Sequence, residues 1–221
     1  MSLTRPKAIL FDLDGTLVDS APDFYAVVNG LRQEAGKASL TDASIREQVS
    51  NGGAALTRLT WEIDDSQADF ADYRARLLAR YSDHIGSASA LFPGFAETLS
   101  WLNQEQILWG IVTNKPRPYT EPLLQRLNIQ AAVVVCPDDV SHAKPHPEPL
   151  LKAAADLGLQ AADCWYVGDH IRDIDAALAA GMLSIAATFG YIESGDDPRD
   201  WQADLQIDQP HDLITLLRAT L

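Results

Sequence analysis

The sequence has few cysteines and no long apolar run. Only Cys136 and Cys164 are present among 221 residues, too few for a disulfide framework, which indicates two reduced core thiols. The longest apolar runs, 131–136 and 183–187, fall well short of the ~20 residues that cross a bilayer. The N-terminal residues also lack the pattern of a signal peptide. We therefore expect a cytoplasmic protein with no membrane partner.

Positive charge is scarce as well. The chain carries 17 lysines and arginines against 31 aspartates and glutamates, a formal net charge of -14. Nucleic-acid binders usually present a basic face, and nothing here supplies one, so no nucleic-acid partner is expected. Most of the acidic residues are expected to form a solvated surface, although a few could surround a hard cation, which prefers oxygen ligands. Charge alone leaves both interpretations open.

From residue 93 onward, short apolar segments alternate with segments of helical periodicity. Together with one strand near the N-terminus, the expected strands are 7–11, 107–112, 133–136, 164–167, 183–187 and 203–207. The expected helices are 94–103, 119–127, 148–157, 173–180 and 212–220. Strands that alternate with helices predict a parallel sheet covered on both faces, a doubly wound, Rossmann-like α/β core.

The segment after the first strand has a different pattern. Residues 19 to about 84 read as helical, with Phe70, Leu77 and Tyr81 among the apolar residues spaced helically between 62 and 85. A break is expected at Ser50-Asn51-Gly52-Gly53. We predict a small all-helical cap domain over 19–87, inserted after the first strand into a core formed by 1–18 and 88–221.

Polar residues follow four of the expected strands. In chain order, these segments are Asp12-Leu13-Asp14-Gly15-Thr16, Thr113-Asn114-Lys115, Lys144, and Gly168-Asp169 with Asp173. The carboxyl ends of parallel strands meet at one edge of a sheet, where ligands bind. Carboxylates gathered there would repel one another unless a cation neutralised them, and Mg²⁺ binds through a few carboxylates. Gly15 would supply the turn that lets the Asp14 carbonyl, rather than its carboxylate, face the metal.

Each segment alone has an ordinary structural explanation. The segment 12–16 could simply close a strand, and Thr113 could cap a helix near Pro116. Lys144 could be a solvated loop lysine, and Asp169 and Asp173 could stabilise a helix start. Their common position at strand ends nevertheless favours one shared site.

These segments resemble the motifs of the haloacid dehalogenase superfamily of phosphatases. The resemblance rests on residues 11–20, 112–115, 144–145 and 168–173, and the helical insertion resembles the mobile cap of that family. It implies that Asp12 is a nucleophile forming an aspartyl-phosphate and that Asp14 is the general acid and then the base. It also implies that Thr113, Asn114 and Lys144 bind the substrate phosphate. The implied Mg²⁺ ligands are Asp12, Asp14, Asp169 and Asp173.

The resemblance also narrows the reaction to a small-molecule phosphate ester. Segments such as 50–54, 136–148 and 190–192 resemble the 2-phosphoglycolate phosphatase group. The 190–192 segment with Asp197-Pro198 and Trp201 also resembles phosphatases of N-acetylmuramic acid 6-phosphate. A sugar-phosphate mutase shares the core motifs and remains an alternative. A phospho-aspartate signalling module is a further one, although such modules lack the cap and the Asp14-type acid.

Five cap residues are candidates for contact with the substrate: Arg46, Asn51, Gly52, Gly53 and Arg58. Backbone N–H groups at a glycine pair that opens a helix suit an anion such as a carboxylate. An ordinary helix start with solvated arginines explains the same residues equally well, so both interpretations stay open.

Overall fold

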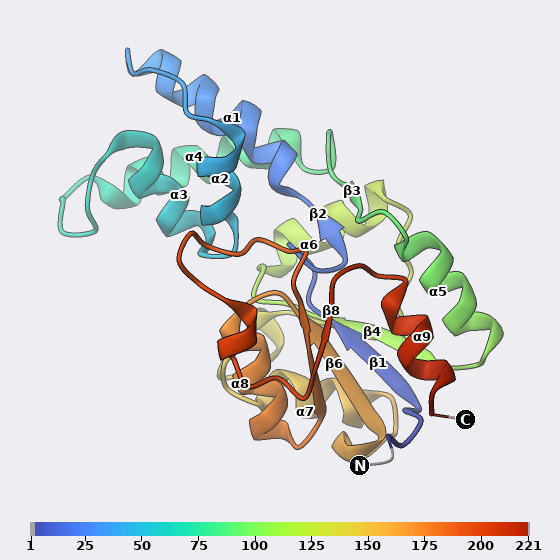
Figure 1. The fold of residues 1–221 in the computed structure, drawn as a ribbon. Coiled ribbons are helices and arrows are strands. Elements are labelled where there is room, and N and C mark those ends of the chain that lie inside the picture. The colour runs from blue at the N-terminus through green and yellow to red at the C-terminus, as the bar shows by residue number, and fades with distance from the viewer. Residues whose placement is uncertain (1–2, 221) are drawn as a thin grey trace.

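A computed structural model describes residues 3–220, and its core is a six-stranded parallel sheet (Figure 1). The strand order is β5-β4-β1-β6-β7-β8, the doubly wound arrangement that the sequence predicts. Every neighbouring pair in this sheet is parallel. The strands are β1 (Ala8–Phe11), β4 (Leu108–Val112), β5 (Val134–Val135), β6 (Cys164–Gly168), β7 (Leu183–Ala187) and β8 (Leu205–Ile207). The predicted α/β fold class is confirmed.

Helices cover both faces of the sheet because its strands are apolar on both sides. Alternate residues of β1 point to opposite faces: Ile9 and Phe11 join one buried cluster, and Ala8 and Leu10 join another. The first cluster is covered by α5 (Phe95–Gln104), α6 (Arg117–Arg126) and α9 (Asp212–Arg218). The second is covered by α7 (Glu148–Asp156) and α8 (Ile171–Ala180). Short 3₁₀ turns are η1 (Pro137–Asp139), η2 (Ala161–Asp163) and η3 (Pro198–Asp200).

A helical cap is inserted after β1, as the sequence predicts. It consists of α1 (Ala21–Glu34), α2 (Asp42–Val49), α3 (Gly52–Trp61) and α4 (Phe70–His84). The chain passes to and from the cap through β2 (Val18–Asp19) and β3 (Ala90–Leu91), which form an antiparallel pair. Strands of two residues carry no periodicity, so no sequence pattern indicated this pair. The boundaries at 18/19 and 87/88 stay predictions, and residues 1, 2 and 221 of the predicted core lie outside the described residues.

The prediction that the helical stretch of the cap includes residues 62–69 is wrong. Helix α3 ends at Trp61, after which Glu62 adopts a left-handed conformation with φ of 58°. A polar turn follows, in which the Ser66 amide donates to the Asp64 carboxylate at 2.8 Å. Aspartate and serine favour such local hydrogen bonds over helix, and helix resumes only at Phe70.

Two buried side chains fix the cap to the core. The Asp23 carboxylate, at the start of α1, accepts hydrogen bonds from the Gly86 and Ala88 amides at 2.6 and 2.7 Å, which holds the returning segment against α1. The Tyr191 hydroxyl, from the core, accepts from the Ser20 and Ala21 amides at 2.7 and 2.8 Å. None of the helices within residues 3–220 is long and apolar enough to span a membrane.

Candidate active site

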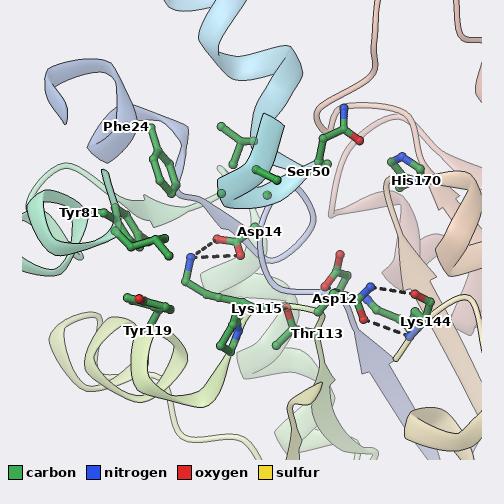
Figure 2. A pocket seen from close by; sticks show the side chains of 18 of the residues that line it. Asp12, Asp14, Phe24, Ser50, Tyr81, Thr113, Lys115, Tyr119, Lys144 and His170 are labelled. Atoms are coloured by element: carbon green, nitrogen blue, oxygen red, sulfur yellow. Dashed lines mark hydrogen bonds and ion pairs between the residues drawn. The ribbon is translucent and has the colours of Figure 1, made fainter. Parts of the chain in front are cut away.

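The polar segments predicted at strand ends lie together at the carboxyl edge of the sheet (Figure 2). β1 is flanked by β4 and β6, with Phe11 in register with both Ile111 and Val167. Asp12 therefore follows the central strand, with Thr113 after one neighbour and Asp169 just after the other. Asn114 holds the loop that carries Lys144 at this edge. Its side-chain amide donates to the Lys144 backbone carbonyl at 2.9 Å and accepts from the Lys144 backbone amide at 3.1 Å.

The ammonium group of Lys144 is buried among oxygen atoms. Its Nζ lies 2.9 Å from Asp12 Oδ1, 2.8 Å from Asp173 Oδ1 and 2.8 Å from the Tyr166 hydroxyl. It also donates to the Val112 carbonyl at 2.9 Å. A buried charge is tolerated only when it is paired and hydrogen-bonded, and Lys144 meets both conditions. The second oxygen of Asp12, Oδ2, accepts no hydrogen bond from residues 3–220 and stays available for a reacting group.

Asp169 is equally buried, and two glycines make room for it. Its Oδ1 accepts from Thr16 Oγ1 at 2.7 Å and its Oδ2 from the Tyr191 amide at 2.9 Å. A Cβ at Gly15 would lie 2.1 Å from Asp169 Oδ2, and one at Gly190 would lie 2.2 Å from Asp169 Cβ. Gly15 also has a φ of +87°, the positive value that the predicted turn requires.

The carboxylates of Asp12, Asp169 and Asp173 form a group suited to a cation. One oxygen from each lies within 4.8 Å of the others. Burial raises the pKa of Asp169 to about 8, and the charges of Asp12 and Asp173 add to the shift. Burial also raises the pKa of Asp12 to about 6, although Lys144 opposes the rise. One lysine therefore leaves negative charge uncompensated, and these all-oxygen ligands fit a hard divalent cation such as Mg²⁺.

Within this group the two flanking aspartates differ. Both oxygens of Asp173 already accept hydrogen bonds, Oδ1 from Lys144 and Oδ2 from the His170 amide at 3.1 Å. Asp173 is therefore paired with the charge of Lys144 and borders the cation position. Asp169 accepts from the neutral Thr16 hydroxyl and Tyr191 amide, and Asp12 Oδ2 accepts no hydrogen bond from residues 3–220.

The carboxylate of Asp14 is turned away from the carboxylate group. It accepts from Ser20 Oγ and pairs with Lys115 Nζ at 3.1 and 3.2 Å (Figure 2). Any contribution of Asp14 to the metal is therefore left to its backbone carbonyl. Burial alone would lower the pKa of Lys115, but Asp14 and Tyr81 outweigh burial and raise it, so the lysine is charged.

Thr113 and Asn114 line the same cavity, with different roles for their side chains. Thr113 Oγ1 accepts from the Lys115 amide at 3.1 Å, so its hydroxyl proton is free to donate. Both ends of the Asn114 amide are used on the Lys144 backbone. The side chain of Asn114 thus positions Lys144, which differs from the expectation that it binds substrate.

A cavity of about 310 Å³ lies between core and cap. The core contributes Asp12, Asp14, Thr113 and Lys144 to its lining. The cap contributes residues 50–54 at the start of α3, together with apolar side chains that include Phe24 and Tyr81. Asn51, Gly52 and Gly53 therefore lie where the sequence predicted them, facing the core residues.

Arg46 and Arg58 are the predicted cap residues that do not line this cavity. Arg58 is exposed and pairs with Asp65 at 2.8 Å. The guanidinium of Arg46 pairs with Asp19 at 2.8 Å and stacks over the Tyr191 ring, 4.5 Å from the centroid. Arg46 thus anchors α2 to the junction between cap and core. The expectation that it binds substrate is corrected because both its charge and its planar face are already engaged.

The first turn of α8 reaches across to the cap through Arg172. Arg172 donates to the Ser50 carbonyl at 2.8 Å and to Asn51 Oδ1 at 3.3 Å. The Asn51 amide nitrogen in turn donates to Glu193 of the core at 2.7 Å. His170, beside Arg172, also lines the cavity. These contacts hold the start of α3 over the carboxylate group.

A second cluster that could hold a metal lies outside this cavity. His142, His146 and Glu148 place one possible ligand atom each within 4.8 Å. Both histidines are exposed, and the Glu148 carboxylate already accepts from the Ser141 and His142 amides at 2.9 and 3.0 Å. Its hydrogen bonds stabilise the loop that carries Lys144.

Sequence reasoning missed Tyr166, Arg172 and the pairing of Lys115 with Asp14. Tyr166 looks like any apolar strand residue, and only the fold brings its hydroxyl to Lys144. Lys115 stands in a predicted site segment, but its partner is far away in sequence. The one sequence signal that could have drawn attention to Tyr166 is its position, two residues before Gly168 in a strand that ends at the site.

Comparisons with known proteins identify the family. A family described as haloacid dehalogenase-like hydrolase matches residues 9–187. The chain belongs to this family. It is 45% identical over 210 residues to a phosphoglycolate phosphatase of Xanthomonas campestris, covering 94% of this chain and 95% of the relative. It is 37% identical over 223 residues to an N-acetylmuramic acid 6-phosphate phosphatase of Pseudomonas aeruginosa, covering 100% and 99%.

A solved structure from Haemophilus somnus, described as a predicted phosphoglycolate phosphatase, superimposes with a TM-score of 0.84. It is 26% identical to this chain and covers 97% of it and 99% of its own length. The predicted family is therefore confirmed. The relatives match over nearly their whole length, so the cap and the core are both shared.

The raised pKa values predict how stability without metal depends on pH. In the folded protein Asp169 and Asp12 hold protons up to about pH 8 and 6, whereas the unfolded chain releases them near 3.8. The folded state binds more protons in this window, so stability falls as the pH rises through it. In EDTA we expect a lower melting temperature at about pH 8.5 than at about pH 5.5.

Asp169→Asn should remove much of this difference, and Asp175→Asn, at an exposed position of α8, should not. Added Mg²⁺ should raise the melting temperature most at the higher pH. A wild-type melting temperature that rises between these pH values in EDTA would contradict the account.

Proposed function

We propose that this protein is a Mg²⁺-dependent phosphomonoesterase that works through an aspartyl-phosphate on Asp12. The observation that carries the proposal is the position of Asp12 at the cavity floor, with Oδ1 held and Oδ2 free. Oδ1 accepts from Lys144 at 2.9 Å and from the Leu13 amide at 2.7 Å. A carboxylate fixed in this way is oriented for attack and is not free to rotate.

In the first step Asp12 Oδ2 forms a bond to phosphorus, and the bond from phosphorus to the ester oxygen breaks. Asp14 gives a proton to the departing alkoxide. Lys144 and Thr113 bind the phosphoryl oxygens, where negative charge gathers. In the second step Asp14 takes a proton from water, which attacks phosphorus and releases phosphate and free Asp12. Mg²⁺, held by Asp12, the Asp14 carbonyl and Asp169 with Asp173 alongside, would screen the nucleophile from the charge of the substrate.

The family and the named relatives support a phosphatase over the alternatives. A phospho-aspartate signalling module would not account for a cap closing a cavity over the nucleophile. A sugar-phosphate mutase would use the same core residues, so it differs in its product rather than in its geometry. We propose a small phosphorylated metabolite as substrate, with 2-phosphoglycolate and N-acetylmuramic acid 6-phosphate as candidates because relatives are named for them.

Other properties of the chain accord with this proposal. A net charge of -14 gives no attraction for nucleic acid, and a cation at the site would reconcile it with an anionic ester. Cys136 and Cys164 are both free and buried, as expected of a protein in the reducing cytoplasm, where we place it.

Asp12→Asn should lower kcat by at least about 10⁴-fold, because the amide cannot form the covalent intermediate. The measurement is release of inorganic phosphate from 2-phosphoglycolate and from glucose phosphates, with a screen for isomerised sugar phosphate. Wild-type protein should release phosphate and form no isomer. Substantial steady-state turnover by the variant would overturn the nucleophile assignment.

Asp14→Asn should slow the release of poor leaving groups most. An alkoxide needs a proton to depart, whereas p-nitrophenolate leaves without one, so the loss of kcat should be larger for alkyl esters. The test compares ethyl phosphate with p-nitrophenyl phosphate. Equal losses on the two esters would contradict the role of Asp14 as acid.

Removal of the metal should abolish phosphatase activity reversibly. After dialysis against EDTA we expect phosphate release to fall to background and Mg²⁺ to restore it, because the nucleophile would otherwise face the substrate phosphate unscreened. His142→Ala and His146→Ala should behave like wild type. Full activity after thorough chelation would count against the metal site.

A further inference from the structure

Lys115 occupies a position between the proposed acid and the cap. Its Nζ lies 3.1 Å from Asp14 Oδ1 and 4.8 Å from the centre of the Tyr81 ring, and its side chain is 7% exposed (Figure 2). Phe24 stacks on Tyr81 with ring centres 4.1 Å apart. Lys115 and both rings line the cavity. The lysine is therefore a charged group in a largely apolar wall, open to a ligand on one side.

The same region holds a buried hydroxyl whose proton has no acceptor among residues 3–220. Tyr81 is 1% exposed and lines the cavity, and its hydroxyl interacts with Lys115, which can only donate. A buried polar group left unpaired is costly, which indicates that an oxygen of a bound molecule completes it. An anionic oxygen close to Lys115 would be within reach of this hydroxyl.

The reach of Lys115 limits where such an anion can lie on a substrate. If Asp14 gives its proton to the ester oxygen, that oxygen lies within hydrogen-bonding distance of Asp14, and Lys115 is also 3.1 Å from Asp14. A carboxylate close to the ester oxygen in the covalent structure can then meet Lys115. In 2-phosphoglycolate the carboxylate carbon is separated from that oxygen by a single methylene.

The carboxylate of N-acetylmuramic acid 6-phosphate lies across a sugar ring from its ester oxygen. An anion that far from Asp12 would meet the cap instead, where Arg74 borders the start of α3. A Cβ at Gly53 would lie 3.7 Å from Arg74 Nε and 3.2 Å from Leu78, so this side chain packs directly beside the glycine pair. Lys115 thus suits a carboxylate close to the phosphate, and Arg74 suits a carboxylate farther from it.

We propose that Lys115 is the specificity-determining residue of this site and that it binds the carboxylate of a 2-phosphoryloxy acid such as 2-phosphoglycolate. This inference rests on the proposed phosphomonoesterase function and narrows its substrate class. The substrate carboxylate replaces the Asp14 carboxylate as the partner of Lys115. The Tyr81 hydroxyl donates to the substrate carboxylate. With esters that lack the carboxylate, Lys115 stays paired with Asp14 and contributes nothing to their recognition.

The test compares kcat/KM for 2-phosphoglycolate with kcat/KM for ethyl phosphate, which has a methyl group in place of the carboxylate. In Lys115→Met the ratio of the two should fall at least ~10-fold, the usual effect of losing a charge-assisted hydrogen bond. Lys115→Arg, which keeps the charge, should recover part of the ratio. Lys152→Met, an exposed lysine of α7 paired with Asp156, is the matched control and should keep the wild-type ratio.

The ratio of the two kcat/KM values distinguishes a lysine that binds the substrate carboxylate from one that only positions Asp14. If Lys115 serves only to hold Asp14, Lys115→Met should slow both esters by the same factor, and an unchanged ratio would overturn the inference while phosphate release still supports the proposed function. A ratio that falls in Arg74→Met but not in Lys115→Met would also overturn it, by placing the carboxylate at the cap. Failure of wild-type protein to release phosphate from both esters, from N-acetylmuramic acid 6-phosphate and from p-nitrophenyl phosphate would remove the proposed function itself.

Discussion

The site depends on one buried ammonium group held among carboxylates. Lys144 Nζ touches Asp12, Asp173 and the Tyr166 hydroxyl, and its side chain is fully buried. A single positive charge lowers the cost of burying Asp12 but cannot compensate Asp169 as well, whose pKa stays raised to about 8. The fold therefore gathers more acidic groups at the sheet edge than Lys144 can neutralise. A divalent cation that replaced their protons would make these carboxylates and an anionic phosphate compatible in one place.

The cap closes a cavity over this charged floor. Contacts of Arg172 with Ser50 and Asn51 join the start of α8, just after Asp169, to the start of α3, so the carboxylate group and the cap are linked through one short segment. Arg46 and Tyr191 fix the cap on its other side. Between these anchors lie Lys115 and its aromatic wall, where the leaving group of a phosphate ester would sit.

The sequence predicted most of the fold and the floor of the site. Alternating strand and helix patterns predicted the doubly wound sheet, and the resemblance of the strand-end segments placed Asp12, Asp14, Thr113, Lys144 and Asp169, whose roles stay predictions. The sequence could not show what each side chain contacts. Arg46 was predicted to contact substrate but pairs with Asp19. The side-chain amide of Asn114 bonds to the backbone of Lys144, and the Tyr166 hydroxyl accepts from Lys144 Nζ. Such pairings join residues distant in the chain, and no local pattern encodes them.

The most direct test of the central claim is a crystal structure with Mn²⁺ and beryllium fluoride, an analogue of the phosphoryl group. The account predicts the beryllium bonded to Asp12 Oδ2, with the anomalous signal of one Mn²⁺ beside Asp12 and Asp169 and Lys144 directed at a fluoride. Manganese bound only by His142, His146 and Glu148, or fluoroberyllate bound away from Asp12, would contradict it.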